Sequence, residues 1–343
     1  MGDKLEDFPL EIEPVEDKVV EEIHKYYKGE RGGFVRVGPH KYVFTEKYVK
    51  EGPRIYNMAL RSDDIIVATY PRSGTTWTQE LVWLLANNLD YKTAAELMLV
   101  QRYVFVEFSS LVSDGLIEEV KEENKDDPQK CKALSSLLVS GVDLVASMPS
   151  PRFIKTHLPF SLLPPNTLDT SRVIYVARDP REVAVSFYHH NRLIRVHNFV
   201  GDFKTYWRHF INNMYIYTPA FPHLKEAWQL RNHPNMLFLF YHEMVKDLPA
   251  VARRVAKFLG KEYNDQEIAG LCEHLDVKNF KKNRSCNLEY TLDAVNMKIQ
   301  GEASFIREGK TGSWRSYFDE EMTKQAEDWM AENLKDTDLR FPS

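Results

Sequence analysis

Residues 65–77 read Ile65-Ile66-Val67-Ala68-Thr69-Tyr70-Pro71-Arg72-Ser73-Gly74-Thr75-Thr76-Trp77. The β-branched apolar run predicts a strand that stops at Tyr70-Pro71, and an apolar helical pattern begins at Trp77. The turn between them carries a basic residue, a glycine and three hydroxyls. Backbone N–H groups at the start of a helix point toward an anion, and the helix dipole favours negative charge there. We therefore expect a P-loop-like turn that binds phosphate.

The alternative for this turn is an ordinary strand–helix connection with a Ser or Thr N-cap. Arg72 argues against that alternative, because capping alone needs no cation. The turn also differs from the Walker A motif G-x-x-x-x-G-K-[ST], since its basic residue precedes Gly74 and no other glycine precedes it in the loop. A nucleoside triphosphatase or kinase is therefore disfavoured, while a phosphate-like ligand is still expected.

Composition restricts the class of protein. The chain has 343 residues, of which 43% are hydrophobic and 12% aromatic, enough for a large core. Its net charge of −5 disfavours a nucleic-acid binder. The three cysteines show no metal-ligand spacing and cannot all pair, which indicates a reducing compartment. With no signal peptide and no apolar run of membrane-spanning length, we expect a cytoplasmic protein without membrane or metal.

Four apolar segments are predicted strands, with helical patterns between them: Ile65–Tyr70, Phe153–Leu158, Val173–Ala177 and Met236–Tyr241. This alternation predicts one α/β domain over residues 1–343, with a central parallel sheet flanked by helices. Ligands of such sheets lie beyond the carboxyl ends of the strands. Polar residues stand there in this sequence, namely Arg72, His157, Arg178 and Tyr241.

Two helices are clearly indicated. The first follows the third strand, where Asp179 can act as N-cap, Pro180 suits the first helical position and Glu182 completes an arrangement like a capping box. The second runs from about Asp319 to Leu334, and its apolar stripe indicates core packing.

An inserted segment, about residues 108–150, interrupts the α/β pattern. Its first half is acidic, as solvated helix faces and mobile loops usually are. Its second half, Leu134–Met148, is too apolar for a simple linker. We expect this segment to fold over another part of the molecule.

Lys155 and His157 share one face of the second strand, because strand side chains alternate with period two. A lone histidine is more often structural than catalytic. A histidine beside a lysine at a strand end, in a sheet that carries a phosphate loop, favours catalysis.

Further residues indicate anion binding. Arg178, at a strand end, and Ser186, in the next helix, could converge on one phosphate, although Arg178 could instead pair with Asp179 or Glu182. The loop Arg307–Trp314 is basic and contains glycines, which allow close approach of the backbone to an anion. Together these features suggest a ligand with phosphate at two separated places.

The motifs Thr69–Trp77, Lys155–Pro159, Tyr175–Ser186 and Arg307–Trp314 resemble those of the cytosolic sulfotransferases, in the same order and over most of the chain. The sequence is most similar to the insect retinol dehydratase branch of that family. That similarity is carried by Asn235–Tyr241, Asp319–Glu327, Leu334–Arg340 and the long inserted segment.

The resemblance implies the co-substrate 3′-phosphoadenosine 5′-phosphosulfate (PAPS) and no metal. His157 would be the general base, Lys155 would hold the transferring sulfuryl group, and Arg72 would act as an electrostatic clamp. The 5′ side of the donor would lie in the loop formed by Arg72, Ser73, Gly74, Thr75 and Thr76. The 3′-phosphate and adenine would contact Arg178, Ser186, Arg307, Glu308, Gly309, Trp77, Tyr241 and Val277.

Three positions depart from the family pattern. Arg72 replaces the usual lysine and cannot act as a general acid. Glu308 replaces a usual lysine, so contact there would have to come from the backbone, and Val277 stands where an aromatic residue or methionine often flanks adenine. The family's dimerisation motif is also not kept, because Arg315, Asp319, Glu320 and Lys324 occupy its places; a homodimer stays possible.

The predicted function is transfer of a sulfuryl group to a small lipophilic alcohol or phenol. Three alternatives stay open: a dehydratase that sulfates an allylic alcohol such as retinol and then eliminates sulfate, a non-catalytic nucleotide-binding protein, and a small-molecule kinase. Candidate acceptor-pocket residues, which could equally be core residues, are Phe105, Phe108, Phe160, Phe187 and Tyr188.

Overall fold

A five-stranded parallel sheet forms the centre of the protein, in a computed structural model that describes residues 8–307 and 309–342. The strands run in the order β5-β6-β4-β7-β8, and every neighbouring pair is parallel. Their bounds are β4 Ile65–Thr69, β5 Val104–Phe105, β6 Phe153–Thr156, β7 Arg172–Ala177 and β8 Met236–Phe240. The predicted α/β fold with a central parallel sheet is therefore confirmed, and β5 is an additional strand.

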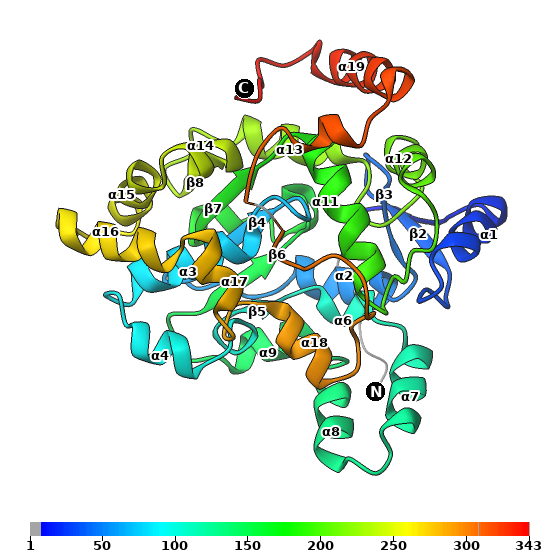
Figure 1. Cartoon of the computed structure of the whole chain (residues 1–343), viewed down its shortest axis with the longest axis horizontal. Coiled ribbons are helices and arrows are strands. Elements are labelled where there is room, and N and C mark those ends of the chain that lie inside the picture. The colour runs from blue at the N-terminus through cyan, green and yellow to red at the C-terminus, as the bar shows by residue number, and fades with distance from the viewer. Residues whose placement is uncertain (1–7, 308, 343) are drawn as a thin grey trace.

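Alternate residues of β4, β6, β7 and β8 pack into two different hydrophobic cores, so the sheet is covered on both faces. In β4, Ile66 and Ala68 belong to one core, and Ile65 and Val67 belong to the other. The first core contains side chains from α2 Tyr48–Tyr56, α11 Pro180–Leu193, α12 Phe203–Ile211, α13 Ala220–Gln229 and α19 Glu320–Leu334 (Figure 1). The second contains side chains from α3 Thr75–Ala86, α15 Leu248–Phe258, α16 Asp265–His274 and α17 Val277–Lys282.

A small antiparallel sheet near the N-terminus was not predicted. It has the order β1-β2-β3, with β1 Ile12–Pro14, β2 Phe34–Val37 and β3 Tyr42–Thr45, and α1 Asp17–Tyr26 connects its first two strands. These strands have only three or four residues, too few for a period-two pattern to stand out.

The inserted segment is helical and contains a hairpin that projects from the body (Figure 1). Its helices are α6 Phe108–Leu111, α7 Asp114–Glu123, α8 Pro128–Ser136 and α9 Gly141–Ser147. Apolar residues of α7 and α8 share a third core with residues around α18 Leu288–Ala294. The shorter elements that remain are α4 Tyr91–Glu96, α5 Leu99–Arg102, α10 Thr167–Thr170, α14 Tyr241–Lys246, η1 Phe160–Leu162 and η2 Ser313–Ser316.

The caps of α11 and α19 agree with the sequence analysis except at one residue. Asp179 and Asp319 accept backbone hydrogen bonds as the N-caps of these helices. Glu182 does not close a capping box: its carboxylate accepts from the backbone N–H of Gly312 and from Ser313, and it pairs with Arg178. The capping-box prediction is therefore wrong, because a tertiary contact takes this side chain.

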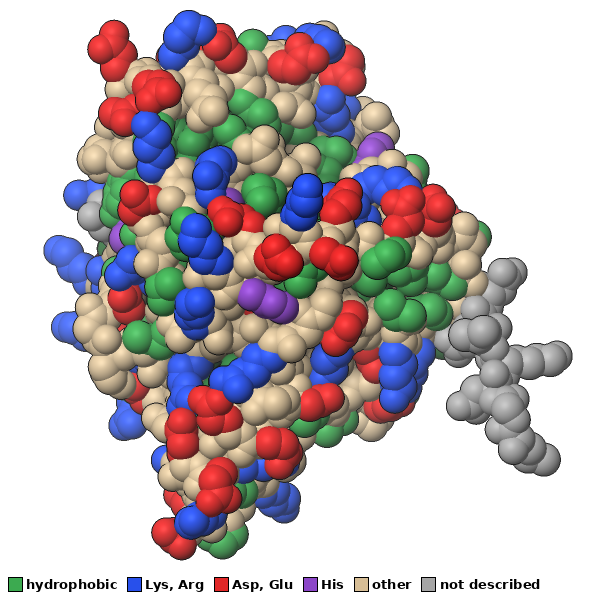
Figure 2. Space-filling model, turned by 90° about the vertical axis from the view of Figure 1, so that its right-hand side faces the viewer, with side chains coloured by type: hydrophobic (Ala, Val, Ile, Leu, Met, Phe, Trp, Pro, Cys, Tyr) green, Lys and Arg blue, Asp and Glu red, His purple; other side chains and the backbone are tan. Residues whose placement is uncertain are grey.

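Acidic and basic side chains are interspersed over the face shown in Figure 2, including the projecting hairpin at its lower end. Among the described residues, no helix is long and apolar enough to cross a membrane.

Candidate active site

The loop between β4 and α3 has the backbone that close approach to an anion requires. Gly74 has φ +96°, and a Cβ atom there would lie 2.7 Å from the Tyr241 ring, so only glycine fits. Arg72 also has a positive φ of 66°. The Oγ atom of Ser73 is buried and has no hydrogen-bond partner among the described residues. A buried hydroxyl without a partner is costly, which indicates that this loop is built for a ligand.

His157 is positioned as a neutral base. It follows β6, and its Nδ1 atom lies 2.9 Å from the carbonyl oxygen of Thr69. Because a carbonyl can only accept, Nδ1 carries the ring hydrogen and Nε2 keeps a free lone pair. Burial and, to a lesser extent, the charge of Lys155 hold the pKa of His157 well below its usual value. The imidazole is therefore neutral at pH 7, with the Nε2 lone pair unprotonated.

Lys155 lies on the same face of β6 and points its ammonium at an aromatic ring. Its Nζ is 3.9 Å from the centroid of Phe105. Burial lowers the pKa of Lys155 to about 8, although the nearby Glu107 opposes the shift. The side chain is thus a desolvated cation beside a neutral base.

Glu107, which the sequence analysis missed, is buried behind these two residues. Its Oε1 accepts from the backbone N–H of His157 at 2.6 Å, and its Oε2 accepts from Thr156 at 3.0 Å. Tyr217 donates to the same carboxylate at 3.3 Å. Burial raises the pKa of Glu107 to about 7. The only sequence signal was its place just after a two-residue strand, which is too short for a pattern to reveal.

A cluster of arginines faces the phosphate loop. The Nε of Arg72 donates to Ser186 Oγ at 3.2 Å, and an Nη of Arg178 donates to the carbonyl of Arg72 at 3.0 Å. Burial, with the charges of Arg178 and Arg307, lowers the pKa of Arg72. The ion pair between Arg178 and Glu182, at 3.4 Å, balances only part of this charge. Cations gathered in a buried place attract a multiply charged anion.

A flat apolar region adjoins the arginines. The rings of Trp77 and Tyr241 are 6.0 Å apart, and Arg178 stacks on Tyr241 at 4.3 Å. Gly309 has φ +65°, and a Cβ there would lie 3.0 Å from a methyl of Val277. These residues could enclose a planar ring next to the cations.

One cavity of about 640 Å³ joins the phosphate loop, the base and an apolar chamber. Most predicted site residues line it: Arg72, Gly74, Thr75, Thr76, Trp77, Phe105, Phe108, Lys155, His157, Arg178, Ser186, Phe187, Tyr241, Val277, Arg307 and Gly309. Ser73 is buried within the loop and is not among the lining residues, and Glu308 is outside the described residues. The roof of the apolar chamber includes Ser136, Leu137, Val139 and Leu144 from the inserted segment.

Two predicted pocket aromatics do not line this cavity. Phe160 packs at the hydrophobic core, where its ring lies 6.3 Å from that of Tyr175. Tyr188 packs against Phe203 and Tyr206. Both assignments are corrected to partly buried packing against the first core. For Tyr188 the reason is that a helix places neighbouring residues such as Phe187 and Tyr188 on different sides.

Comparison with known proteins agrees with this geometry. The sulfotransferase-domain family model matches residues 62–338. The luciferin sulfotransferase of Photinus pyralis is 33% identical, over 88% of this chain and 80% of that protein. Sulfotransferase 1A1 of Rattus norvegicus is 28% identical, over 86% of this chain and 93% of that protein. The crystal structure of retinol dehydratase with retinol and PAP aligns with a TM-score of 0.92 at 44% identity, covering 98% of this chain and 99% of that one.

Proposed function

This chain belongs to the sulfotransferase family, and on that basis we propose that it transfers a sulfuryl group from PAPS to the hydroxyl of a small lipophilic alcohol or phenol. The observation that carries the proposal is a single cavity lined by the neutral His157, the cationic Lys155 and the arginine cluster. A protein that only binds nucleotide needs no base at the apolar end.

In the proposed reaction, the acceptor hydroxyl gives its proton to Nε2 of His157. The oxygen attacks sulfur as the bond between sulfur and the donor phosphate breaks, so the sulfate ester and adenosine 3′,5′-bisphosphate (PAP) are the products. Lys155 and Arg72 stabilise the negative charge that develops around sulfur. Positioning of the two substrates in line supplies much of the remaining acceleration.

We propose the donor-binding residues from the family resemblance, and the geometry of the cavity supports them. The loop Arg72–Thr76, with its buried Ser73 hydroxyl, would hold the 5′ side of the donor. Arg178, Ser186, Arg307 and the backbone at Gly309 would hold the 3′-phosphate. The adenine would lie against Trp77, near Tyr241 and Val277.

The inserted segment is proposed to be a lid on the acceptor chamber. Leu137, Val139 and Leu144, from the apolar second half of the segment, line the cavity. Salt bridges join Arg195 to Glu119 and Glu123 and hold α7 against the body. A lid of this kind excludes water from the reacting groups.

A dehydratase is the second candidate. The 44% identity over 98% of this chain to retinol dehydratase favours it. In that case the C–O bond of an allylic sulfate ester would break inside the chamber and release sulfate. The resulting carbocation would give up a proton to the departing sulfate, and the dehydrated product would leave.

The test is incubation with sulfur-labelled PAPS and a panel of phenols, steroids and retinol, with products separated by chromatography. We expect labelled ester from at least one acceptor, and a dehydrated hydrocarbon from retinol if the second candidate holds. Binding of PAP without turnover of any acceptor would instead indicate a non-catalytic nucleotide-binding protein.

His157→Ala in the same assay tests the base. We expect turnover to fall by at least about a hundredfold, while calorimetry shows PAP binding retained. His40→Ala, which removes a histidine 45% exposed outside the cavity, is the matched control. Substantial turnover by His157→Ala would contradict the assigned role.

A further inference from the structure

We propose that the acceptor chamber contains a second polar subsite, formed by His190 and His197, that binds a second hydroxyl group of the acceptor. The inference rests on the proposed function and names the class of acceptor more narrowly. Both histidines line the same cavity as His157, and both are largely enclosed by protein. Neither has a part in the transfer chemistry.

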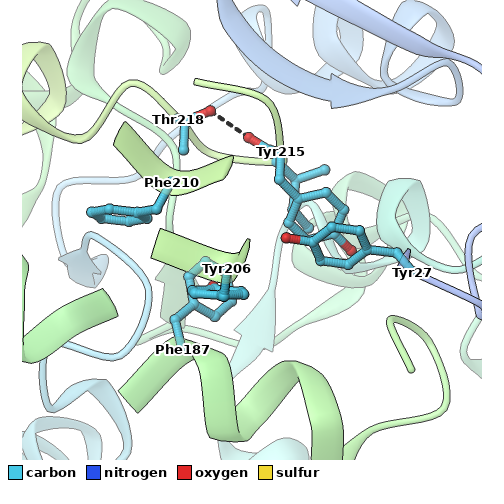
Figure 3. Close-up of a pocket in the computed structure, with 7 residues that line it drawn as sticks. Tyr27, Phe187, Tyr206, Phe210, Tyr215 and Thr218 are labelled. Atoms are coloured by element: carbon cyan, nitrogen blue, oxygen red, sulfur yellow. Dashed lines mark hydrogen bonds between the residues drawn. The ribbon is translucent and has the colours of Figure 1, made fainter. Parts of the chain in front are cut away.

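His197 is held in one orientation by a buried polar cluster. Its Nδ1 lies 2.7 Å from the hydroxyl oxygen of Tyr215 and 3.2 Å from Oε1 of Glu30. The single hydroxyl proton of Tyr215 goes to Glu30, so Nδ1 of His197 carries a hydrogen and donates it. Tyr27 stacks on Tyr215 with centroids 3.7 Å apart and so restrains the Tyr215 ring (Figure 3).

His190 is oriented in the same way by its neighbour in α11. Asn191 donates from Nδ2 to Tyr206 at 3.2 Å, which leaves its Oδ1 as an acceptor. His190 Nδ1 lies 3.4 Å from that Oδ1 and is therefore the donor. Burial and, to a lesser extent, Arg72 hold the pKa of His190 well below its usual value, so its Nε2 keeps a lone pair.

The two histidine rings lie near each other, and neither Nε2 atom has a protein partner among the described residues. Their ring centroids are 5.6 Å apart. One aromatic ring separates them from the transfer site: Phe305 lies 4.5 Å from the Arg72 guanidinium and 6.0 Å from the His190 ring. A ligand extending past Phe305 from the transfer site would reach this pair.

The chemistry of the pair selects a hydroxyl. A hydroxyl can donate its single proton to the Nε2 lone pair of His190 or of His197, because both nitrogens are acceptors. A carbonyl lacks the proton that His190 needs, and an alkyl group leaves both nitrogens unsatisfied, which is costly in an apolar chamber. Sites built around a substrate hydroxyl reject analogues that lack it more strongly than apolar pockets reject a missing methylene. The acceptor class is therefore a lipophilic phenol or alcohol with a second hydroxyl.

A series of matched phenols tests this subsite. Each 4-(ω-hydroxyalkyl)phenol, with a chain of two to six carbons, is compared with the 4-alkylphenol of the same length, and the phenolic sulfate is the product scored. At one chain length we expect kcat/KM to favour the hydroxyl compound by about tenfold. His197→Leu and His190→Leu should each reduce this ratio toward one, His197→Gln should keep part of it, and His40→Leu should leave it unchanged.

A wild-type ratio near one at every chain length would overturn the subsite, as would a ratio that survives both leucine substitutions. Calorimetric binding of the same phenols to the PAP-loaded protein separates this inference from the proposed function. Binding that prefers the hydroxyl compound without any turnover would refute the transfer reaction and support the subsite. Turnover of both phenols at equal efficiency would refute the subsite alone.

Discussion

His157 and Lys155 must be in opposite protonation states for the proposed chemistry. Burial favours the neutral form of both side chains, and it lowers both pKa values. The histidine pKa lies well below its usual value, while that of Lys155 falls only to about 8 because Glu107 opposes the shift. A neutral base therefore coexists with a charged lysine between mildly acidic pH and about pH 8.

The pH profile should show this window. Lys155 loses its proton as pH rises through about 8, so kcat/KM should fall above that pH. Protonation of His157 should not lower kcat/KM between pH 7 and 6, because the His157 pKa is well below 6.5. An aliphatic alcohol is the acceptor to use, since its hydroxyl does not ionise in this range. Lys155→Arg should shift the basic limb to higher pH, and an unmoved limb would contradict the assignment.

Glu107 is expected to act by positioning His157. Its carboxylate accepts the backbone N–H of His157 and the hydroxyl of Thr156. Glu107→Leu leaves a buried N–H without an acceptor, which costs about 1–3 kcal/mol of stability, and kcat should fall. Glu107→Gln keeps one carbonyl acceptor, so it should retain more of the stability and more of kcat than Glu107→Leu. Thermal unfolding and steady-state kinetics measure the two effects, and equal losses in both variants would argue against a positioning role.

At the scale of elements, β7 and α11 together carry the residues of the proposed 3′-phosphate site. Arg178 directly follows β7, and Ser186 lies within α11. Glu182, between them, accepts from Gly312 and Ser313 and so ties the glycine-bearing loop to this helix. The carboxylate of Glu182 therefore holds the loop that contains Gly312 close to Arg178.

Arg178→Ala and Ser186→Ala should each weaken donor binding more than they slow the bound-state chemistry. For Arg178, one lost charge-assisted hydrogen bond of about 1.5–3 kcal/mol predicts a rise in the KM for PAPS of about ten- to a hundredfold. The serine substitution should give a smaller rise. Arg253→Ala, at an exposed position of α15, is the control. A fall in kcat with an unchanged KM for PAPS would contradict the proposed 3′-phosphate site.

At the scale of the molecule, the inserted segment contributes residues both to the lining of the cavity and to the third hydrophobic core. Val112, Leu116 and Leu134 pack with Ile194 and Val295 in the third hydrophobic core. The residues that follow α8 turn back over the cavity. The hairpin is thus anchored beside the cavity, and the residues that follow it contribute to the cavity's lining.

Replacing residues 113–140 with a short Gly–Ser loop should reduce kcat/KM for bulky apolar acceptors more than for a small phenol. Bulky acceptors depend on the apolar roof for burial, whereas a small phenol contacts mainly the groups near His157. Lys125→Ala combined with Asp126→Ala changes only the tip of the hairpin and should leave the ratio unchanged. If both acceptors lose equally while circular dichroism shows an intact fold, the segment is not a lid.

The local sequence was sufficient for four of the five strands of the central sheet, for the strand–loop–helix around Arg72 and for the shared face of Lys155 and His157. Each depends on neighbours in the chain: alternation within β6, the apolar run of β4, and the glycine and hydroxyls that follow it. Steric limits and strand periodicity act over a few residues, so such patterns can be recognised without the fold.

Only the tertiary structure decided which other side chains reach the cavity. It placed Glu107 behind His157, brought Glu30 and Tyr215 onto His197, and packed Phe160 and Tyr188 against the first core. These contacts join residues from different elements, and buried polar groups find whichever partner the packing brings near. Because hydrogen bonding and burial depend on distance in space rather than on separation along the chain, no local pattern could have predicted them.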